Sequence, residues 1–430
     1  MKLRFWGATN SVTGSATFLE LEGGTILIDS GLYQGSVSTE KENLIPYPQE
    51  AAKLHAVLIT HAHLDHTGYL PRLVKLGFRG KIHCTPATAR LMRIILLDSA
   101  KLSEGDFYSE EDVHHTMNLV ESHEFGEHFQ LLNASVTFQS AGHILGAASL
   151  VLKADNKKIV FSGDLGRDTD PILLPHPPAP EADVLILEST YGGKIRHGDL
   201  QKELHTFLMS VSRGSKVGII ASFAVARGQL LLELIHEFFE RHPEEKVRVV
   251  MDSPMMKAAN EVYTQYSSLT QRPEDLRISL EEIDSIEFSR EWTSLKKKSG
   301  PLVILSSSGM VSGGRILRHL YNWHEDESAL LFLPGYQGEG TYGRALSEGQ
   351  RQLVFEGRAF TWSGEILTSE AFSSHADQNE LVSWAGDYNR DAKVFLVHGE
   401  KEGKLALKKK LQANGILSVE IPEKGNVYEI

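Results

Sequence analysis

The segment ITHAHLDHTGYLP places three histidines and one aspartate, His61, His63, Asp65 and His66, within six positions. Imidazole nitrogens and carboxylate oxygens suit Zn²⁺, and hydrolytic zinc sites leave one position open for water. His61 and His63 alternate along a short extended segment, so both side chains can face one ion. Asp65 and His66 precede the helix start that we expect at Thr67–Gly68, and they can turn to a second ion. The spacing predicts a site for two metal ions.

Two metal ions need more ligands than these four residues, and three further residues are candidates. They are His143 in SAGHILG, Asp164 in FSGDLG and His398 in FLVHGE, each beside a glycine that lets the backbone turn sharply. The two carboxylate oxygens of Asp164 can bridge two ions. A lone His143 or His398 is more often a structural histidine, so their assignment depends on the spaced cluster.

The composition restricts both the site and the class of protein. Cys84 is the only cysteine of the 430 residues, so a thiolate metal cage and an intramolecular disulfide are excluded. The formal net charge of −12 argues against adhesion to polyanions over the whole surface, although metal ions and a few arginines can reverse the sign locally. No apolar run reaches the ~18 to 20 residues of a membrane helix, and the N-terminus lacks the apolar region of a signal peptide. We expect a cytoplasmic protein without a membrane partner.

Five short apolar runs, each typical of a buried strand, end at an ionisable residue. They are residues 25–28 before Asp29, 56–59 before His61, 159–161 before Asp164, 184–187 before Glu188 and 394–397 before His398. Sheets of α/β proteins commonly hold their ligands at the carboxyl ends of strands. One polar turn after a strand means little, but five together predict that these strands position the site.

The pattern changes between residues 196 and 370, where strand-like and helix-like segments alternate. KVGIIASF, for example, precedes the helical LLLELIHEFFERH. Such βαβ units predict a parallel, doubly wound sheet. The last sixty residues return to strands that end in ligand-type residues. We therefore expect an inserted domain of residues 196–370 within one discontinuous domain formed by residues 1–195 and 371–430.

The sequence as a whole resembles a known family. HAHLDH together with Asp29, His143 and Asp164 resembles the metallo-β-lactamase fold. Six further motifs are similar to those of its β-CASP nucleases: LESTYG at 187–192, FAVARGQ at 223–229, SSGMVSGGR at 307–315, GYQGEGTYGR at 335–344, FSSHADQ at 372–378 and VHGE at 397–400. The resemblance implies an αββα sandwich with an inserted β-CASP domain, in a minimal two-domain member of the family.

The resemblance also implies roles for individual residues and two Zn²⁺ ions per chain. His61, His63, His143 and Asp164 would hold one ion, and Asp65, His66, Asp164 and His398 would hold the other. Asp29 would orient a ligand, and Asp65, Glu188 and His375 would be the catalytic residues, with His375 as proton donor and Glu188 orienting it. Family members with a histidine at the motif that contains His398 act on RNA.

The implied activity is that of a zinc-dependent ribonuclease. Metal-bound hydroxide would hydrolyse phosphodiester bonds of single-stranded RNA and leave 5′-phosphate ends. A glycine-rich turn between a strand and a helix can present N–H groups to phosphate. We expect contacts to the RNA backbone from one serine, two glycines and three arginines, namely Ser374, Gly313, Gly314, Arg227, Arg315 and Arg344.

Two other functions stay open at this point. One is a metallohydrolase of the same fold that acts on a small thioester or lactam, and the other is a catalytically silent scaffold that binds RNA. A homodimer is the candidate assembly. Four more histidines, His114, His115, His123 and His128, lie in the polar tract DVHHTMNLVESHEFGEH, for which we expect a solvated helix and loop without metal ligands.

Overall fold

A computed structural model of the chain describes residues 1–103, 107–276, 278, 284–285 and 300–430. The chain divides into two compact units, unit 1 with Met1–Ile195 and Ser374–Ile430, and unit 2 with Arg196–Ser373. The sequence predicted domain boundaries after residues 195 and 370, and the two units divide after residues 195 and 373.

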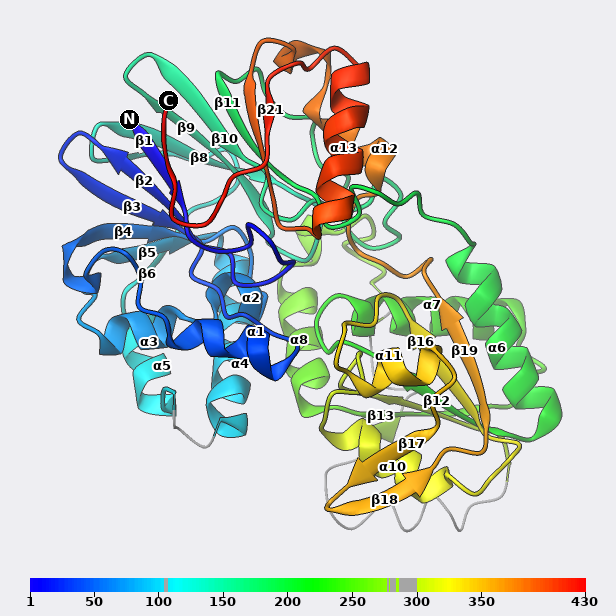
Figure 1. Cartoon of the computed structure of the whole chain (residues 1–430). Helices are drawn as coiled ribbons and strands as arrows, with labels where there is room; N and C mark the ends of the chain where they lie inside the picture. Colours follow the sequence, from blue (N-terminus) through cyan, green and yellow to red (C-terminus); the bar gives the residue numbers. More distant parts are fainter. Residues whose placement is uncertain (104–106, 277, 279–283, 286–299) are drawn as a thin grey trace. The chain divides into compact units, whose positions relative to one another are not determined.

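Unit 1 contains two seven-stranded sheets (Figure 1). The first sheet has the order β22-β1-β2-β3-β4-β5-β6, with bounds Val427–Glu429, Lys2–Phe5, Thr17–Leu21, Gly24–Ile28, Leu54–Leu58, Lys81–Cys84 and Val120–Ser122. The second has the order β21-β20-β11-β10-β9-β8-β7, with bounds Val419–Glu420, Lys393–Val397, Val184–Glu188, Lys157–Phe161, Ala148–Ala154, Ala134–Ser140 and His128–Leu131. Strands β3, β4, β10, β11 and β20, which correspond to the five expected runs, all lie in the parallel parts of these sheets.

The two sheets enclose one hydrophobic core, which explains their apolar sequences. Phe5 and Ile26 of the first sheet and Phe138, Phe161 and Phe395 of the second are buried in the same cluster. Helices cover the outer faces, α3 to α5 on the first sheet and α12 and α13 on the second (Figure 1). Their bounds, with that of the short α2, are Leu64–Thr67, Leu70–Lys75, Pro86–Leu102, Glu110–Met117, Gln378–Ala385 and Lys401–Ala413. Unit 1 is an αββα sandwich.

Unit 2 is built on a six-stranded sheet in which every pairing is parallel. Its order is β14-β13-β15-β12-β16-β19, with bounds Asp284–Ser285, Arg248–Asp252, Leu302–Ser306, Val217–Ala221, Leu330–Pro334 and Glu365–Ser369. The helices among its described residues are α6, α7, α8, α10 and α11, with bounds Leu200–Gly214, Arg227–Arg241, Pro254–Gln265, Arg315–Trp323 and Tyr342–Ser347. Strands β17 and β18, Gln352–Phe355 and Arg358–Thr361, form a hairpin.

The strand order of unit 2 reverses direction, because the chain moves from β12 to β13 on one side and from β15 to β16 on the other. Right-handed crossovers in opposite directions place helices on both faces of such a sheet. The expected fold class, a metallo-β-lactamase sandwich with an inserted doubly wound domain, is confirmed.

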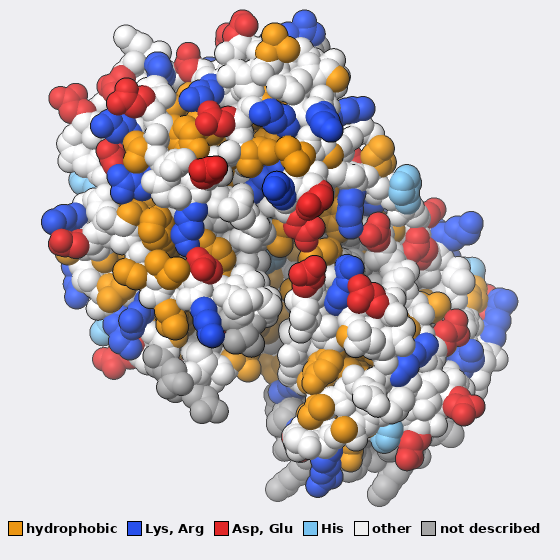
Figure 2. Space-filling model, in the orientation of Figure 1, with side chains coloured by type: hydrophobic (Ala, Val, Ile, Leu, Met, Phe, Trp, Pro, Cys, Tyr) orange, Lys and Arg blue, Asp and Glu red, His pale blue; other side chains and the backbone are white. Residues whose placement is uncertain are grey.

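Among the described residues, no helix is both long and apolar enough to cross a bilayer. On the face drawn in Figure 2, acidic and basic side chains are interspersed on each unit.

Candidate metal centre

The candidate site of unit 1 begins where five strands end. Strands β3 and β4 of the first sheet lead to Asp29 and His61, and β10, β11 and β20 of the second lead to Asp164, Glu188 and His398. The ligand-bearing strands are therefore shared between two sheets that meet at the site, which brings residues more than 300 positions apart into contact. His66 and His398, for example, approach within 3.0 Å through their Nε2 atoms.

One helical turn, α2, places Asp65 and His66. It spans Leu64–Thr67, with His63 before it and Gly68 at its end, so the expected helix start at Thr67–Gly68 is wrong. Long-range bonds explain this early turn, because Asp65 and His66 carbonyls accept the N–H groups of Ser15 and Ser30 at 2.7 and 2.8 Å. Contacts of this kind are not encoded in the local sequence.

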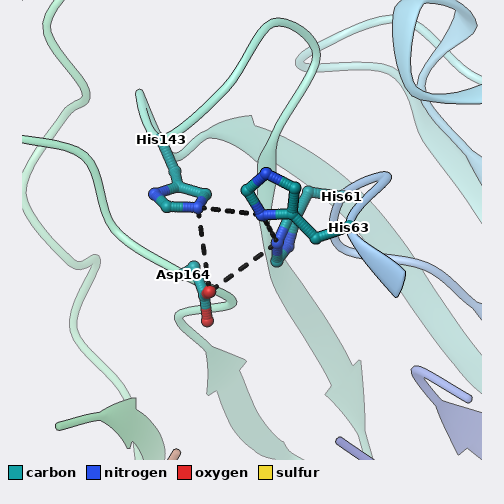
Figure 3. Close-up of side chains that lie close together, drawn as sticks. All are labelled: His61, His63, His143 and Asp164. Carbon is teal, nitrogen blue, oxygen red and sulfur yellow. Dashed lines mark hydrogen bonds and ion pairs between the residues drawn. The ribbon is translucent and has the colours of Figure 1, made fainter. Parts of the chain in front are cut away.

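The first group of candidate ligands consists of His61, His63, His143 and Asp164, whose ligand atoms all lie within 4.8 Å of one another (Figure 3). His63 Nδ1 is 3.1 Å from His61 Nε2 and 3.2 Å from His143 Nε2. Asp164 Oδ2 lies 3.6 Å from His61 Nε2 and 3.8 Å from His143 Nε2. Three imidazoles and one carboxylate oxygen thus surround a single point.

The second group consists of Asp65, His66 and His398. Asp65 Oδ2 lies 3.2 Å from His398 Nε2, and the other oxygen of Asp164, Oδ1, lies 3.4 Å from His66 Nε2. Asp164 therefore directs Oδ2 to the first group and Oδ1 to the second, as a ligand shared by two ions would. All seven residues expected to be ligands lie together in unit 1.

In four of these histidines, the ring nitrogen that is not part of a ligand group has a hydrogen-bond partner. The pairs are His66 Nδ1 with Asp29 Oδ2 at 2.7 Å, His61 Nδ1 with Thr60 Oγ1 at 3.1 Å, His398 Nδ1 with Thr190 Oγ1 at 3.0 Å and His143 Nδ1 with the Ser374 carbonyl at 3.4 Å. Such partners fix the tautomer and leave the other nitrogen free for a metal. Thr60 and Thr190 were not expected as partners, although each lies two residues after the end of a strand, β4 or β11, that leads to a candidate residue.

The electrostatics of the groups fit a divalent cation. Burial lowers the pKa of His61 and His143 well below the usual value and that of His63 to about 4, so these rings are neutral and can act as ligands. Burial opposes ionisation of Asp164, but His398 and His66 hold its pKa well below the usual range. Its Oδ1 is buried and has no hydrogen-bond partner among the described residues. A buried carboxylate oxygen with an unused acceptor beside imidazoles matches the donor set of Zn²⁺.

Glu188 and His375 form a separate pair beside the first group. His375 Nδ1 lies 3.3 Å from Glu188 Oε1, and this carboxylate also accepts the N–H groups of Leu165 at 2.8 Å and Thr190 at 3.1 Å. Burial would lower the pKa of His375, but Glu188 raises it. The side chain of His375 is 20% exposed and that of Glu188 only 1%, so the imidazole, and not the carboxylate, can reach a substrate.

The other residues expected to bind substrate, Ser374 apart, lie in unit 2. Arg315 begins α10 and is paired through Nη1 with Asp252 Oδ1, and Gly314 precedes it with φ of +76°. Gly313 is half-buried. Arg227 is buried, with its guanidinium 4.8 Å from the ring centre of Phe223.

Arg344 and Ser374 complete the set of expected substrate contacts. Arg344 is exposed and donates from Nε to Glu348 Oε1 at 2.6 Å. Ser374 lies in unit 1, where its carbonyl faces His143. Phosphate binding by these residues stays a prediction.

A sandwich that holds clustered histidines and aspartates at the ends of its strands defines a metal-dependent hydrolase of the metallo-β-lactamase fold. Three family models match the chain: a beta-lactamase superfamily domain at residues 25–214, a Beta-Casp domain at 228–346 and a Zn-dependent metallo-hydrolase RNA specificity domain at 363–422. Ribonuclease TTHA0252 of Thermus thermophilus is 35% identical, over 96% of this chain and 97% of that protein. The chain belongs to the β-CASP family of metallo-β-lactamase hydrolases.

Further relatives agree with this membership. An RNase J-like protein of Methanocaldococcus jannaschii is 33% identical over 100% of this chain and 99% of that protein. Cleavage and polyadenylation specificity factor 73 of Drosophila melanogaster is 28% identical over 100% of this chain and 65% of that protein. A crystal structure of a protein of unknown function from Enterococcus faecalis V583 has a TM-score of 0.58 at 14% identity and covers 99% of both chains, a likeness in fold alone.

Proposed function

We propose that the protein is a ribonuclease that uses two Zn²⁺ ions to hydrolyse phosphodiester bonds of single-stranded RNA and leaves 5′-phosphate ends. The observation that carries the proposal is the seven-residue cluster, in which Asp164 directs one oxygen to each group of ligands. RNA as substrate is supported by the match to an RNA specificity domain over residues 363–422, which contain His375 and His398. It is also supported by the names of the two relatives that cover nearly the whole chain.

The donor set of each group suits one Zn²⁺ ion. His61, His63 and His143 with Asp164 Oδ2 would hold the first, and Asp65, His66 and His398 with Asp164 Oδ1 would hold the second. When bound, such a pair of ions lowers the pKa of a shared water towards ~7 and offsets negative charge on the phosphate oxygens.

The remaining chemistry is the departure of the 3′-oxygen, which needs a proton. His375 is placed to donate it, because Glu188 holds its Nδ1 side and raises its pKa while part of the ring stays exposed. The attacking water supplies the new oxygen of the 5′-phosphate as the bond from phosphorus to the 3′-oxygen breaks, and the upstream fragment keeps a 3′-hydroxyl that carries the donated proton. Glu188, itself held by two backbone N–H groups, acts through His375 and positions it.

The proposal is tested with single-stranded RNA and DNA of the same sequence, labelled at the 5′ or 3′ end and with free or blocked ends. We expect RNA to be cut much faster than DNA, products with 5′-phosphates, and an affinity for RNA that falls as salt rises. Mass spectrometry should find two zinc ions per chain that depend on these seven residues. His398→Ala should lose one zinc and the activity, whereas the matched His115→Ala, exposed on α5, should keep both.

Other outcomes of this experiment identify the alternatives. Comparable cleavage of DNA would show that the substrate assignment is wrong. Hydrolysis of a chromogenic ester without cleavage of RNA would indicate a small-molecule hydrolase, and RNA binding without bound zinc or cleavage would indicate a scaffold. The cytoplasmic location and the homodimer stay predictions, and sedimentation tests the latter.

A further inference from the structure

A second cluster of metal-ligand residues lies in unit 1 on β5 and β6, outside the seven-residue site. His83 on β5 pairs in register with Glu121 on the parallel strand β6. His123 follows β6 two residues after Glu121, and its N–H continues the ladder to the Cys84 carbonyl at 3.0 Å. Registered residues of neighbouring strands share a face, and so do residues two apart in one strand. The three side chains therefore project from the same side of the first sheet.

The expected place of His123 in a solvated tract is wrong. Its residue exposure is 6%, whereas His114, His115 and His128 of that tract are exposed. The ring of His123 stacks on Phe129 of the second sheet, with centroids 3.7 Å apart and an interplanar angle of 8°. The tract is short of apolar residues, so its sequence does not show that an aromatic ring from the other sheet covers this histidine.

The geometry of this second cluster matches that of the candidate catalytic ligands. His83 Nδ1 and His123 Nε2 are 3.0 Å apart, compared with 3.1 Å for His61 and His63 and 3.0 Å for His66 and His398. Two nitrogens bound to one tetrahedral zinc at ~2.0 to 2.1 Å are roughly 3.3 Å apart, so a shift of a few tenths of an ångström suffices. Glu121 Oε1 lies 4.0 Å from His123 Nε2, and a ligand atom of each of the three residues lies within 4.8 Å of the others.

A carboxylate fixes the tautomer of His123. Its Nδ1 lies 3.3 Å from Glu127 Oε1, and the other oxygen of Glu127 accepts the N–H of Glu124 at 2.9 Å. Because a carboxylate only accepts hydrogen bonds, Nδ1 carries the proton and Nε2 of the neutral ring presents a lone pair towards His83. A carboxylate behind a histidine in this way is the usual outer partner of a metal ligand.

His83 and Glu121 complete the requirements for a cation. Burial lowers the pKa of His83 to about 4, so this ring is neutral at physiological pH. Its Nε2 has no hydrogen-bond partner in the part of the chain that the structure describes, so no neighbour fixes the tautomer and the proton can sit on Nε2 while Nδ1 binds an ion. Glu121 supplies negative charge, and its side chain is 50% exposed, which gives an ion and a water molecule a path from solvent.

We propose that His83, His123 and Glu121 form a third, non-catalytic zinc site, with water in the fourth position. Two nitrogens and one carboxylate oxygen are a donor set that Zn²⁺ and similar divalent transition metals accept. The ion would join β5 to β6, which is the edge strand of the first sheet. It would lie beside Phe129 on β7, which is the edge strand of the second sheet. Its role would be to stabilise the edge of the sandwich, independently of the proposed catalysis.

Zinc content of matched variants tests this site. Wild type, His123→Gln and the control His128→Gln are dialysed against metal-free buffer at micromolar protein concentration and analysed by mass spectrometry. His128 serves as control because it lies in the same tract and is exposed on β7. We expect His123→Gln to hold one zinc fewer than both other proteins. Equal zinc in all three, or zinc bound at the site only at millimolar concentration, would overturn the proposal and leave a hydrogen-bonded histidine pair.

Diffraction from wild-type crystals at the zinc edge gives a test that needs no variant. An anomalous peak within bonding distance of both His83 Nδ1 and His123 Nε2 is expected, and its absence from zinc-soaked crystals would contradict the site. His83→Phe, which keeps an aromatic ring beside Phe129, replaces His123→Gln if the latter does not fold. RNA cleavage should be unchanged in these variants, so a failure of the proposed catalysis is distinguishable from a failure of the third site.

Discussion

The replacement Asp29→Asn tests how the second group of ligands is oriented. Asp29 is buried directly after β3 and accepts hydrogen bonds from four groups: the Thr60 N–H at 2.8 Å, Thr60 Oγ1 at 2.9 Å, His66 Nδ1 at 2.7 Å and Ser15 Oγ at 3.5 Å. Since the carboxylate only accepts, it keeps the proton of His66 on Nδ1 and leaves Nε2 free. An asparagine has one oxygen, which the Thr60 N–H engages, so its NH₂ group faces His66 Nδ1.

A donor at that position favours the opposite tautomer, in which His66 Nε2 carries the proton and cannot bind a metal. Loss of a partner behind a ligand typically costs 10- to 100-fold in metal affinity, or about 1.4 to 2.7 kcal/mol. We expect Asp29→Asn to reach the upper part of this range, because the amide opposes the required tautomer. Asp29→Ala should weaken zinc binding less, but it leaves the buried Thr60 N–H unpaired and costs about 1 to 3 kcal/mol of stability.

Competition with a chromophoric chelator measures the affinity of each zinc, and urea unfolding measures stability. Asp155→Asn is a matched control, because Asp29 and Asp155 are both left-handed, with φ of +57° and +49°, but Asp155 is exposed in the turn before β10, at the opposite end of that strand from Asp164. Only the zinc held by Asp65, His66 and His398 should weaken in Asp29→Asn. Unchanged affinity for both ions would refute the tautomer argument, and an equal loss at both would show that Asp29 supports the whole site.

Three further changes have expected outcomes. His375→Ala should keep both zincs but lose ~10² to 10⁴ in turnover, and turnover should recover on RNA whose leaving 3′-oxygen is replaced by sulfur. Glu188→Gln should show the same pattern more mildly. Zinc loss in either variant would make His375 a ligand. Burial lowers the pKa of Lys404 to about 7, below its value in the unfolded chain, so the destabilisation that Lys404 causes grows as pH falls. Between pH 7.5 and 9.5 the free energy of unfolding of the wild type should rise by about 2 kcal/mol relative to that of Lys404→Met. Unfolding curves without such a rise would contradict this prediction. Gly31→Ala would place Cβ 1.6 Å from the Asp65 carbonyl oxygen, so it should displace α2 and lower both the melting temperature and the zinc content, and a wild-type melting curve would disprove the contact.

Much of the fold follows from the sequence because the five strands that lead to the site are short, largely apolar and followed or ended by an ionisable residue. Strand β11, with the sequence VLILE, is buried along its whole length, since the core covers one face and helices cover the other. A run of this kind predicts a central strand, whose last residue, Glu188, lies at the carboxyl end of the strands. The sequence did not show that the five strands belong to two sheets, because pairing depends on contacts between distant segments.

The residues whose surroundings the sequence could not predict are those whose neighbours come from elsewhere in the chain. Arg315 follows a glycine pair that suits phosphate, yet Asp252 at the end of β13 pairs with it. Arg227 was expected to contact RNA, yet it is buried at the start of α7 and its Nε donates to the Phe372 carbonyl, 145 positions away, at 3.4 Å. His123 has polar neighbours in sequence and an aromatic neighbour in space. In each case a group outside the residue's own helix or strand decides the environment.

His398 shows how backbone strain and the metal centre are connected. It is one of the few non-glycine residues in the left-handed region, with φ of +51°. Its N–H donates to the Ala8 carbonyl at 2.7 Å and its own carbonyl accepts the Ser189 N–H at 3.0 Å, so two segments far away in sequence hold it on both sides.

The next residue, Gly399, has to be a glycine, because a Cβ there would lie 2.5 Å from the Ser189 carbonyl oxygen. Left-handed backbone at a non-glycine residue costs of order 1 to 3 kcal/mol and persists where surrounding contacts over-determine it. The left-handed backbone turns the chain after β20, so that His398 Nε2 lies beside Asp65 and His66. An extended residue that continued the strand would point elsewhere. The fold therefore carries a local free-energy cost at His398, the residue that completes the second group of candidate ligands.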